Sequence, residues 1–427
     1  MIKSVALHTL GCKLNFSETS TIGRLLENDG FMRKDFNEVA DIYVINTCSV
    51  TDNADKECRF LVRQIQRKAP GAMVVITGCY AQLKPAEIAA IPGVDLVLGA
   101  SEKFNITEHL KSITKGDSAK ICSCDIEDVN VFAPSQSLND RTRVFLKVQD
   151  GCDYNCSFCT IPLARGRSRS DTVDNVIANV NAIAAQGVKE VVLTGINLGD
   201  FSPPVTQWQY LKKLPAKENF YTLIQELDKL EGMGRYRISS IEPNLLSNDI
   251  IEFVSSSKNF MPHFHIPLQS GNNKMLGLMR RRYKRELYAE KVTFIKKLMP
   301  HCCIGADVIV GFPGETDEFF KDTFDFLDSL DIAYLHVFTY SERANTLAAT
   351  MKPVVPVQVR NERNKILRNL SYQKMQHFTA LHVGETRQVL FEMHNKNGMM
   401  EGYTDNYIKI TAPFKKEWEN NIVSWKI

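Results

Sequence analysis

The sequence alternates between strand-like apolar runs and helical stretches, and this alternation constrains the fold more than any other feature. Near the amino terminus, apolar runs at Ser4–Thr9, Asp41–Asn46 and Met73–Thr77 alternate with helical stretches at Ser17–Asn28 and Asp52–Lys68. Continuous apolar strands that alternate with helices are typical of a parallel sheet covered by helices. The sequence therefore predicts an α/β fold that begins with a doubly wound, parallel-sheet domain.

Each of the three apolar runs is followed closely by a cysteine. These residues are Cys12, Cys48 and Cys79. Because the carboxyl ends of parallel strands meet at one edge of a sheet, the three thiols are expected to meet there. The alternative is that they are three buried, inert thiols at strand ends.

A second alternation of strands and helices begins near residue 140. Its predicted strands are Val144–Val148, Glu190–Thr194, Tyr236–Ser240, His263–Leu268, Ile304–Val310 and Ala333–Thr339. Its predicted helices include Val173–Gln186, Asn248–Ser256, Arg285–Leu298 and Glu318–Ser329. Six such units predict an incomplete (β/α)6 barrel, with functional residues at the carboxyl ends of the strands. The proline-rich stretch Ser202–Ala216 interrupts the pattern and is interpreted as an inserted loop.

The carboxyl-terminal part follows a different pattern. A helix predicted over Gln358–Leu381 is followed by short alternating runs at Thr386–Glu392, Met399–Tyr403 and Tyr407–Thr411, which predict a small all-β module. The predicted boundaries are residues 1–115 for the first domain, 116–139 for a linker, 140–370 for the barrel and 371–427 for the β module.

The composition indicates the cellular compartment of the protein and the role of its cysteines. No apolar run reaches the roughly 18 residues of a membrane span, and the first residues lack a signal-peptide cleavage site. We therefore expect a cytoplasmic protein with no membrane partner. Disulfides are rare in the cytoplasm, so organised cysteines among the 11 in the chain indicate metal binding or catalysis.

The most specific motif is Cys152-x-x-x-Cys156-x-x-Cys159, directly after the first strand of the barrel series. Three close thiolates suit an iron–sulfur cluster, whereas a structural zinc site would need a fourth ligand. The uncoordinated iron of a cubane cluster could chelate the amino and carboxylate groups of S-adenosylmethionine (SAM). Phe158 is placed to lie against the adenine. Three unrelated thiols are the alternative interpretation.

These residues resemble the radical SAM superfamily. Cys12 in Thr-Leu-Gly-Cys-Lys-Leu-Asn, Cys48 in Asn-Thr-Cys-Ser-Val and Cys79 in Thr-Gly-Cys-Tyr-Ala-Gln resemble the amino-terminal domain of the methylthiotransferases. The terminal β module resembles their TRAM domain. The resemblance implies two [4Fe–4S] clusters: one on the barrel triad that cleaves SAM, and an auxiliary one on the first triad that carries sulfur or a methylthio group.

Further residues at the ends of barrel strands are predicted to bind SAM. They are Thr194 and Gly195 after the second strand, Glu242 after the third, Gln269 after the fourth and Gly311 after the fifth. Glu242 is assigned to the ribose, and the backbone near Gly311 to the adenine. Each could equally be a helix cap or a turn residue.

Arginine clusters supply the candidate RNA contacts. Arg165 and Arg167 follow the SAM-cluster motif, and Arg281 and Arg282 follow the fourth barrel strand. Guanidinium groups suit phosphate by charge and geometry. A solvated surface with no ligand is the alternative, and the net charge of only +3 does not itself favour RNA.

The motifs resemble most closely the subgroup of methylthiotransferases that act on threonylcarbamoyladenosine in tRNA. Thr-Leu-Gly-Cys-Lys-Leu-Asn and Met-Arg-Arg-Arg-Tyr are two segments that carry this likeness. The resemblance implies methylthiolation at C2 of the modified adenine next to the anticodon. It also implies binding of the tRNA anticodon stem-loop and a flavodoxin- or ferredoxin-type electron donor, and leaves the sulfur source open. Isopentenyladenosine tRNA or a ribosomal-protein aspartate are alternative substrates, and a non-catalytic iron–sulfur RNA-binding or redox-sensing protein is an alternative of another class.

Overall fold

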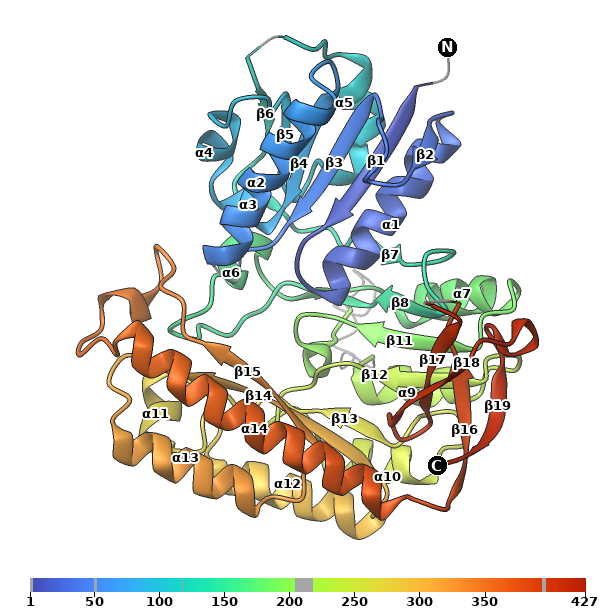
Figure 1. Ribbon diagram of the computed structural model, residues 1–427, viewed down its shortest axis with the longest axis vertical. Helices are drawn as coiled ribbons and strands as arrows, with labels where there is room; N and C mark the ends of the chain where they lie inside the picture. Colours follow the sequence, from blue (N-terminus) through green and yellow to red (C-terminus); the bar gives the residue numbers. More distant parts are fainter. Residues whose placement is uncertain (1–2, 50–51, 117, 204–217, 394–396) are drawn as a thin grey trace, which may run out of the picture.

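The structure is a computed structural model that describes residues 3–49, 52–116, 118–203, 218–393 and 397–427. An amino-terminal α/β domain lies over one side of an incomplete barrel, and a small antiparallel sheet packs at the far end of the barrel (Figure 1). Most of the predicted insertion Ser202–Ala216 lies outside the described residues.

The amino-terminal domain is built on a parallel sheet of order β2-β1-β3-β4-β5-β6. Its strands are β1 (Ser4–Thr9), β2 (Met32–Lys34), β3 (Ile42–Thr47), β4 (Met73–Gly78), β5 (Leu96–Leu98) and β6 (Lys120–Cys122). Its helices are α1 (Lys13–Asn28), α2 (Asp52–Lys68), α3 (Cys79–Leu83), α4 (Pro85–Ala89) and α5 (Ile106–Lys111). The predicted doubly wound, parallel architecture is confirmed.

The side chains of β3 explain why helices cover both faces of this sheet. Tyr43 and Ile45 point into a core shared with α2, whereas Ile42 and Val44 point into a core shared with α1 and α5. Every residue of β3 is buried. A strand with apolar side chains in both directions can be stable only between two layers of helix.

The barrel consists of two sheets that meet at single bridges. One has the order β12-β11-β8-β7 and the other β13-β14-β15, and bridges from Tyr236 to Phe260 and from Ser240 to His265 join them. The strands are β7 (Ser135–Gln136), β8 (Arg143–Lys147), β11 (Glu190–Thr194), β12 (Arg235–Ile238), β13 (His263–His265), β14 (Cys303–Val310) and β15 (Tyr334–Thr339). Edges at β7 and β15 leave the barrel unclosed, as predicted.

Helices cover the outside of this barrel. They are α7 (Val173–Ala184), α9 (Phe220–Asp228), α10 (Asn248–Ser256), α11 (Asn273–Leu278), α12 (Arg285–Leu298) and α13 (Asp317–Ser329), whereas the short helix α6 (Ile161–Arg165) packs against α3 of the amino-terminal domain. Thr172, Ser247 and Thr316 each cap the following helix, because each side chain accepts a hydrogen bond from a backbone N–H of the first turn.

The segment predicted as a linker contributes a strand to each neighbouring sheet. β6 pairs with β5 in the amino-terminal sheet, and β7 pairs antiparallel with β8 in the barrel. The hydroxyl oxygens of Ser17 and Ser135 lie 2.9 Å apart, which attaches α1 to β7. The domain boundaries themselves stay a prediction.

The long helix α14 (Val357–Leu381) packs along β15 and continues past residue 370 into an antiparallel sheet of order β18-β17-β16-β19. The strands are β16 (Thr386–Phe391), β17 (Met399–Thr404), β18 (Lys409–Pro413) and β19 (Ile422–Lys426). β19 was not predicted, because its half-buried residues follow a polar stretch that gives no clear strand signal. Arg235 fixes this sheet to the barrel by donating a 2.7 Å hydrogen bond to the Gln388 carbonyl.

Candidate functional site

Two cysteine triads lie at the contact between the amino-terminal domain and the barrel. Cys12, Cys48 and Cys79 follow β1, β3 and β4, which are neighbours in the parallel sheet, so the structure brings the three to one edge. Cys48 and Cys79 are buried, and Cys12 is exposed. Thiols from three loops therefore converge, and one of them is open to solvent.

Two glycines allow these loops to approach each other. Gly11 has a φ of 101°, and a Cβ there would lie 2.7 Å from the Cβ of Cys48 and 2.9 Å from its Sγ. Gly78 has a φ of 97°, and its Cβ would lie 2.4 Å from the carbonyl oxygen of Thr47. Only glycine fits at either position. The sequence signal, a glycine directly before Cys12 and before Cys79, was available but was not used.

The second triad lies on one loop that follows β9 (Gln149–Asp150) and ends at α6. β10 (Arg169–Ser170) pairs antiparallel with β9 and closes the segment at its base. Cys152, Cys156 and Cys159 are all partly exposed. The loop is thus a compact, anchored structure at the carboxyl end of the first barrel strand.

Each sulfur of this triad accepts one hydrogen bond from the protein. The donors are the Tyr154 N–H to Cys152 (3.4 Å), the Ile161 N–H to Cys159 (3.4 Å) and Nη1 of Arg281 to Cys156 (3.1 Å). Burial raises the pKa of Cys152 and of Cys159 to about 12, and a bound metal would favour the thiolate forms. Three sulfurs with directed donors fit a [4Fe–4S] cluster that keeps one iron open.

The predicted SAM contacts lie at strand ends, as expected, and the structure places two of them next to the second triad. The Phe158 ring packs edge-on against the ring of Phe312, with 6.4 Å between the centroids. Phe312 is the residue after Gly311, so Phe158 also lies near that predicted contact. The Glu242 carboxylate pairs with Arg281, the residue that also contacts Cys156. Contact of these residues with SAM stays a prediction.

Unsatisfied polar atoms gather after β11. Thr194 Oγ1 and both polar side-chain atoms of Asn197 are buried and have no hydrogen-bond partner within the described part of the chain. Gln149 fixes this turn by accepting hydrogen bonds from the N–H groups of Ile196 and Asn197, each 2.8 Å. Buried polar atoms without partners fit a polar ligand such as the SAM amino group. Asn197 was not predicted from the sequence.

The other two predicted SAM contacts are Gly195 and Gln269, which follow different barrel strands. A Cβ on Gly195 would lie 2.8 Å from Gln149 Oε1, so this glycine permits the close turn after β11. Gln269 has a φ of 68° and forms a single bridge with Val308 of β14. Neither Gly195 nor the Gln269 side chain makes a contact with a described residue that identifies a ligand.

Two of the four arginines predicted to contact RNA are buried instead. The side chains of Arg165 and Arg281 are 3% and 4% exposed, because each is held by carboxylates and by a cysteine sulfur. They cannot reach a phosphate in this arrangement, which corrects the prediction for these two residues. Arg167 is exposed, and Arg282 lies over the Tyr154 ring at 3.9 Å from its centroid, so both stay candidates.

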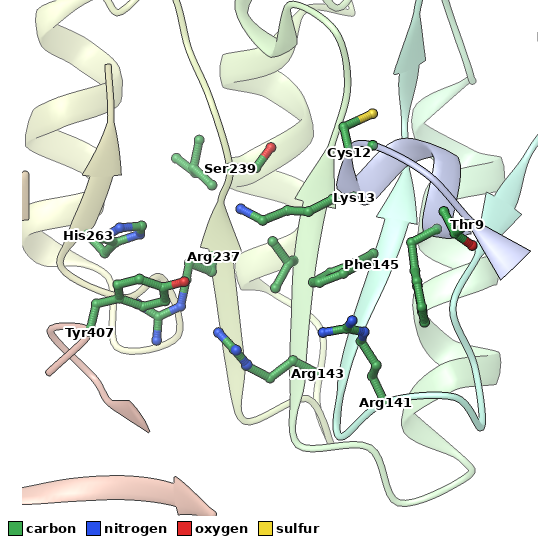
Figure 2. A pocket seen from close by; sticks show the side chains of 14 residues that line it. Thr9, Cys12, Lys13, Arg141, Arg143, Phe145, Arg237, Ser239, His263 and Tyr407 are labelled. Carbon is green, nitrogen blue, oxygen red and sulfur yellow. The ribbon is translucent and has the colours of Figure 1, made fainter. Parts of the chain in front are cut away.

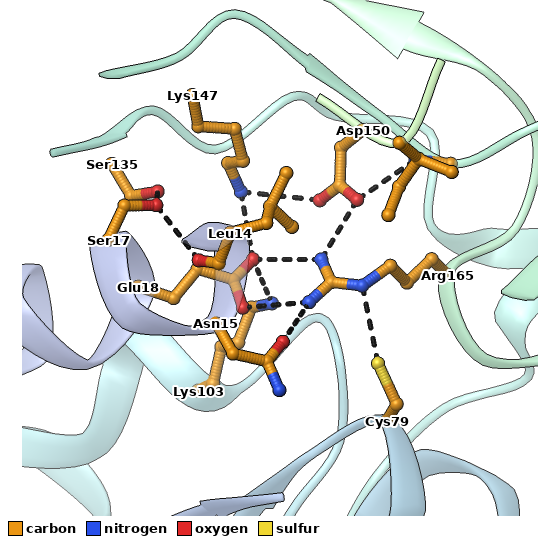
Figure 3. A network of polar contacts seen from close by, with 12 residues as sticks. Leu14, Asn15, Ser17, Glu18, Cys79, Lys103, Ser135, Lys147, Asp150 and Arg165 are labelled. Carbon is orange, nitrogen blue, oxygen red and sulfur yellow. Dashed lines mark hydrogen bonds and ion pairs between the residues drawn. The ribbon is translucent and has the colours of Figure 1, made fainter. Parts of the chain in front are cut away.

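Arg165 belongs to a buried charge network that joins the two domains (Figure 3). Its guanidinium donates to Glu18 of α1 (3.0 and 3.1 Å), to Asp150 of β9 (2.9 Å) and to Cys79 Sγ (3.2 Å). Lys103 and Lys147 also pair with Glu18, at 2.6 and 3.0 Å.

This network carries an excess of positive charge. Four cations, Lys103, Lys147, Arg165 and Arg169, meet two carboxylates, so a thiolate at Cys79 would supply part of the missing negative charge. Burial would raise the pKa of Glu18, but Arg165 and the two lysines hold it well below its usual value. The network therefore fits a metal-bound Cys79 thiolate. This network was not predicted from the sequence, because the only sign of it was Lys147, a charged residue inside a predicted strand.

A cavity of about 320 Å³ opens beside Cys12 (Figure 2). It lies between the start of α1, the inner face of the barrel and the terminal sheet. Residues that line it include Cys12, Lys13, Arg141, Arg143, Arg237 and Tyr407. Figure 2 shows the Lys13 side chain reaching from the Cys12 loop toward Ser239 of the barrel. The exposed cysteine of the first triad thus faces a cationic chamber shared by all three parts of the molecule.

Comparisons with known proteins agree with this arrangement. The model "Uncharacterized protein family UPF0004" matches residues 4–99, and "Radical SAM superfamily" matches residues 146–327. Threonylcarbamoyladenosine tRNA methylthiotransferase MtaB of Bacillus subtilis (strain 168) is 39% identical, with 99% of this chain and 93% of that protein covered. The chain belongs to the MtaB family of radical SAM methylthiotransferases.

Further comparisons give a second MtaB protein, a relative named for another function and a solved structure of the same fold. MtaB of Aquifex aeolicus (strain VF5) is 38% identical over 97% of both chains. A tRNA-2-methylthio-N(6)-dimethylallyladenosine synthase of Clostridium botulinum is 29% identical over 92% of this chain and 86% of its own length. The radical SAM methyltransferase TsrM from Kitasatospora setae has the same fold over 82% of this chain and 74% of its own, with a TM-score of 0.56 at 14% identity.

Family membership decides several predictions. The chain is a radical SAM methylthiotransferase, and the cofactors of such an enzyme are SAM and [4Fe–4S] clusters, as predicted. The interpretation as a non-catalytic iron–sulfur protein is wrong. Among the described residues, no helix is long and apolar enough to cross a membrane.

Proposed function

We propose that this enzyme converts the C2–H bond of the adenine in tRNA threonylcarbamoyladenosine into C2–S–CH3. One SAM donates its methyl group to sulfur, and a second SAM is cleaved reductively. A cluster held by Cys152, Cys156 and Cys159 would pass on the electron for that cleavage, and one held by Cys12, Cys48 and Cys79 would provide the site that carries the sulfur. The proposal is supported by the relatives named threonylcarbamoyladenosine tRNA methylthiotransferase, which match nearly the whole chain.

One observation carries the mechanism: a single side chain connects the two cysteine sites. Arg165 lies at the end of α6, the helix that follows Cys159, and donates a hydrogen bond to Cys79 of the other triad. The two triads are therefore joined through one side chain. A base that entered the cavity beside Cys12 would lie next to the sulfur-carrying centre, and Arg165 connects that centre to the loop of the second triad.

The roles of the protein residues follow from this geometry. Cys152, Cys156 and Cys159 would hold the SAM-cleaving cluster, and Cys12, Cys48 and Cys79 the auxiliary one. Thr194 and Asn197 offer unpaired polar atoms for the SAM amino group. Phe158 would lie against the adenine and Glu242 near the ribose. The cofactors supply the reactivity, and the chain supplies position and excludes competing reactions.

The partners belong to the same proposal. Arg167 and Arg282 are exposed near the SAM-cluster loop and would contact phosphates of the tRNA anticodon stem-loop. The TRAM-like sheet would hold the RNA from the outside. A flavodoxin- or ferredoxin-type protein would deliver the electron.

A direct assay tests the proposed function. Purified enzyme, reconstituted anaerobically with iron and sulfide, is given SAM, a reductant and tRNA carrying threonylcarbamoyladenosine, isopentenyladenosine or neither. Mass spectrometry of the digested nucleosides should detect the methylthio product only with the threonylcarbamoyl substrate. Preference for the isopentenyl substrate, or for a ribosomal protein supplied in parallel, would contradict the proposal.

A further inference from the structure

The cavity beside Cys12 has an unusual charge. Among the described residues that line it, four are lysine or arginine and none is aspartate or glutamate. These cations are Lys13, Arg141, Arg143 and Arg237. A concave site with cations and no acidic wall favours a negatively charged ligand.

Two of the four cations are already paired. Arg143 lies 2.8 Å from the Glu392 carboxylate, and Arg237 lies 3.0 Å from Glu190. The first pair holds Arg143 against the terminal sheet, and the second is within the barrel, from which Arg237 reaches the terminal sheet by donating to the Asp405 carbonyl. Arg143 and Arg237 therefore line the cavity, but their charges are already neutralised by carboxylates.

The other two cations have no acidic partner within the part of the chain that the structure describes. Lys13 has no ion pair or hydrogen bond, and Arg141 contacts only the rings of Phe16 and Phe145, at 4.3 and 5.5 Å from their centroids. Lys13 is also the first residue of α1, whose amino-terminal dipole adds to the positive potential. The cavity thus keeps two cations that form no ion pair within the described residues, although the Asp307 carboxylate acts on Lys13 from a distance.

The rest of the lining suits a planar base. The ring of Tyr407 stacks on His263 with centroids 4.2 Å apart, and Phe16 and Phe145 supply further aromatic surface. The volume of about 320 Å³ is within the range of small-ligand sites. An aromatic base with an acidic substituent would satisfy both the rings and the free cations.

We propose that Lys13 and Arg141 bind the carboxylate of the threonylcarbamoyl group and thereby select the threonylcarbamoyl base over neutral modified adenines. This inference rests on the proposed function and adds the residues that determine its specificity. The pairing orients the base so that its ring lies beside the Cys12 loop. An isopentenyl group would leave both cations desolvated and unpaired, which costs binding energy.

A phosphate of the RNA backbone is the other anion that could occupy this cavity. A carboxylate site discriminates between an anticodon stem-loop with threonylcarbamoyladenosine and the same RNA whose threonyl carboxylate is converted to the amide. A phosphate site does not, because both RNAs carry the same phosphates.

The test compares kcat/KM for these two RNAs in the reconstituted full-length enzyme and in K13Q, R141Q and K297Q. Lys297 is exposed on α12, away from the cavity, and controls for loss of one charge. Iron content and 5′-deoxyadenosine formation verify that K13Q, next to Cys12, keeps its clusters. R141Q provides the same test at a residue that does not adjoin a cysteine.

The wild type and K297Q should prefer the carboxylate RNA by about ten- to a hundredfold. In K13Q and R141Q this preference should fall by about tenfold, mainly through a slower reaction of the carboxylate RNA. An unchanged preference in both variants, or an equal loss with both RNAs, would overturn the inference. A wild type that makes no product from either RNA would instead overturn the proposed function.

Discussion

The two cysteine sites are built in opposite ways. The Cys152, Cys156 and Cys159 site lies on one short loop, and each of its sulfurs accepts a hydrogen bond from the protein. The Cys12, Cys48 and Cys79 site is assembled from the ends of three strands. It combines two buried thiols with one exposed to a cavity.

The difference fits the two tasks proposed for these sites. A cluster that cleaves SAM keeps its three protein ligands fixed, and a local loop with its own donors achieves this. A site that delivers sulfur has to be accessible to a large substrate on one side. The sheet edge provides this access, because Cys12 is exposed and lines the cavity. Four predictions test this separation of roles.

Removal of the local triad should have the largest effect. Replacing Cys152, Cys156 and Cys159 by alanine should abolish 5′-deoxyadenosine formation and leave iron for one cubane cluster, about four atoms per chain. Iron analysis and chromatography of the SAM products measure both. Continued SAM cleavage by this variant would show that the radical site lies elsewhere.

Removal of the sheet-edge triad should separate the two activities. Alanine at Cys12, Cys48 and Cys79 should abolish the methylthio product, because no site carries sulfur, yet leave uncoupled 5′-deoxyadenosine formation. Mass spectrometry of tRNA nucleosides and of the SAM products gives the two readings. Normal product formation without added sulfide would contradict a role for this triad.

The two buried arginines should differ in their contribution to stability. Arg165→Ala leaves Glu18 and Asp150 buried without their main partner, which should cost about 3–5 kcal/mol. Arg281→Ala removes a partner from Glu242, which is partly exposed, and a hydrogen bond from Cys156, and should cost about 1–3 kcal/mol. Denaturant unfolding of the reconstituted proteins, followed by circular dichroism, provides the comparison. Equal losses would mean that the network around Arg165 is not the stronger junction.

The smallest expected effect tests the packing of the sheet-edge site. Gly11→Ala places a Cβ 2.7 Å from Cys48 and should reduce retention of the auxiliary iron while SAM cleavage persists. Gly30→Ala is the matched control, since Gly30 also has a positive φ, of 90°, but nothing lies within 4 Å of its added Cβ. Both substitutions should cost about 1–2 kcal/mol in backbone strain, and only the first should release iron.

Local patterns predicted most of the fold. β1, β11, α10 and α12 have the predicted bounds, because burial on both sides of a strand and on one face of a helix leaves a regular trace in the sequence. β19 was missed because it packs at an edge, where half-buried residues weaken that trace. The cluster cysteines could be predicted because the spacing of three thiols in a short segment is typical of iron–sulfur ligands.

The charged residues of the site could not be predicted in the same way. Arg165 and Arg167 both belong to a basic run, but the first is buried in ion pairs and the second is exposed. Glu18, the partner of Arg165, is 147 positions away in the sequence. Whether an arginine meets solvent or a distant carboxylate depends on how two domains dock, and no local pattern records that.

The strands β6 and β7 make the chain hard to divide. The segment between the amino-terminal sheet and the barrel adds one strand to each, so both sheets are completed by the same stretch of polypeptide. A cut placed before this segment would expose the edge of β5, and a cut placed after it would expose β8. Bare edges of this kind invite pairing with other chains. Only a cut between β6 and β7 leaves both sheets complete, so a chimaera has to be joined there and has to keep the residues of both halves that contact each other.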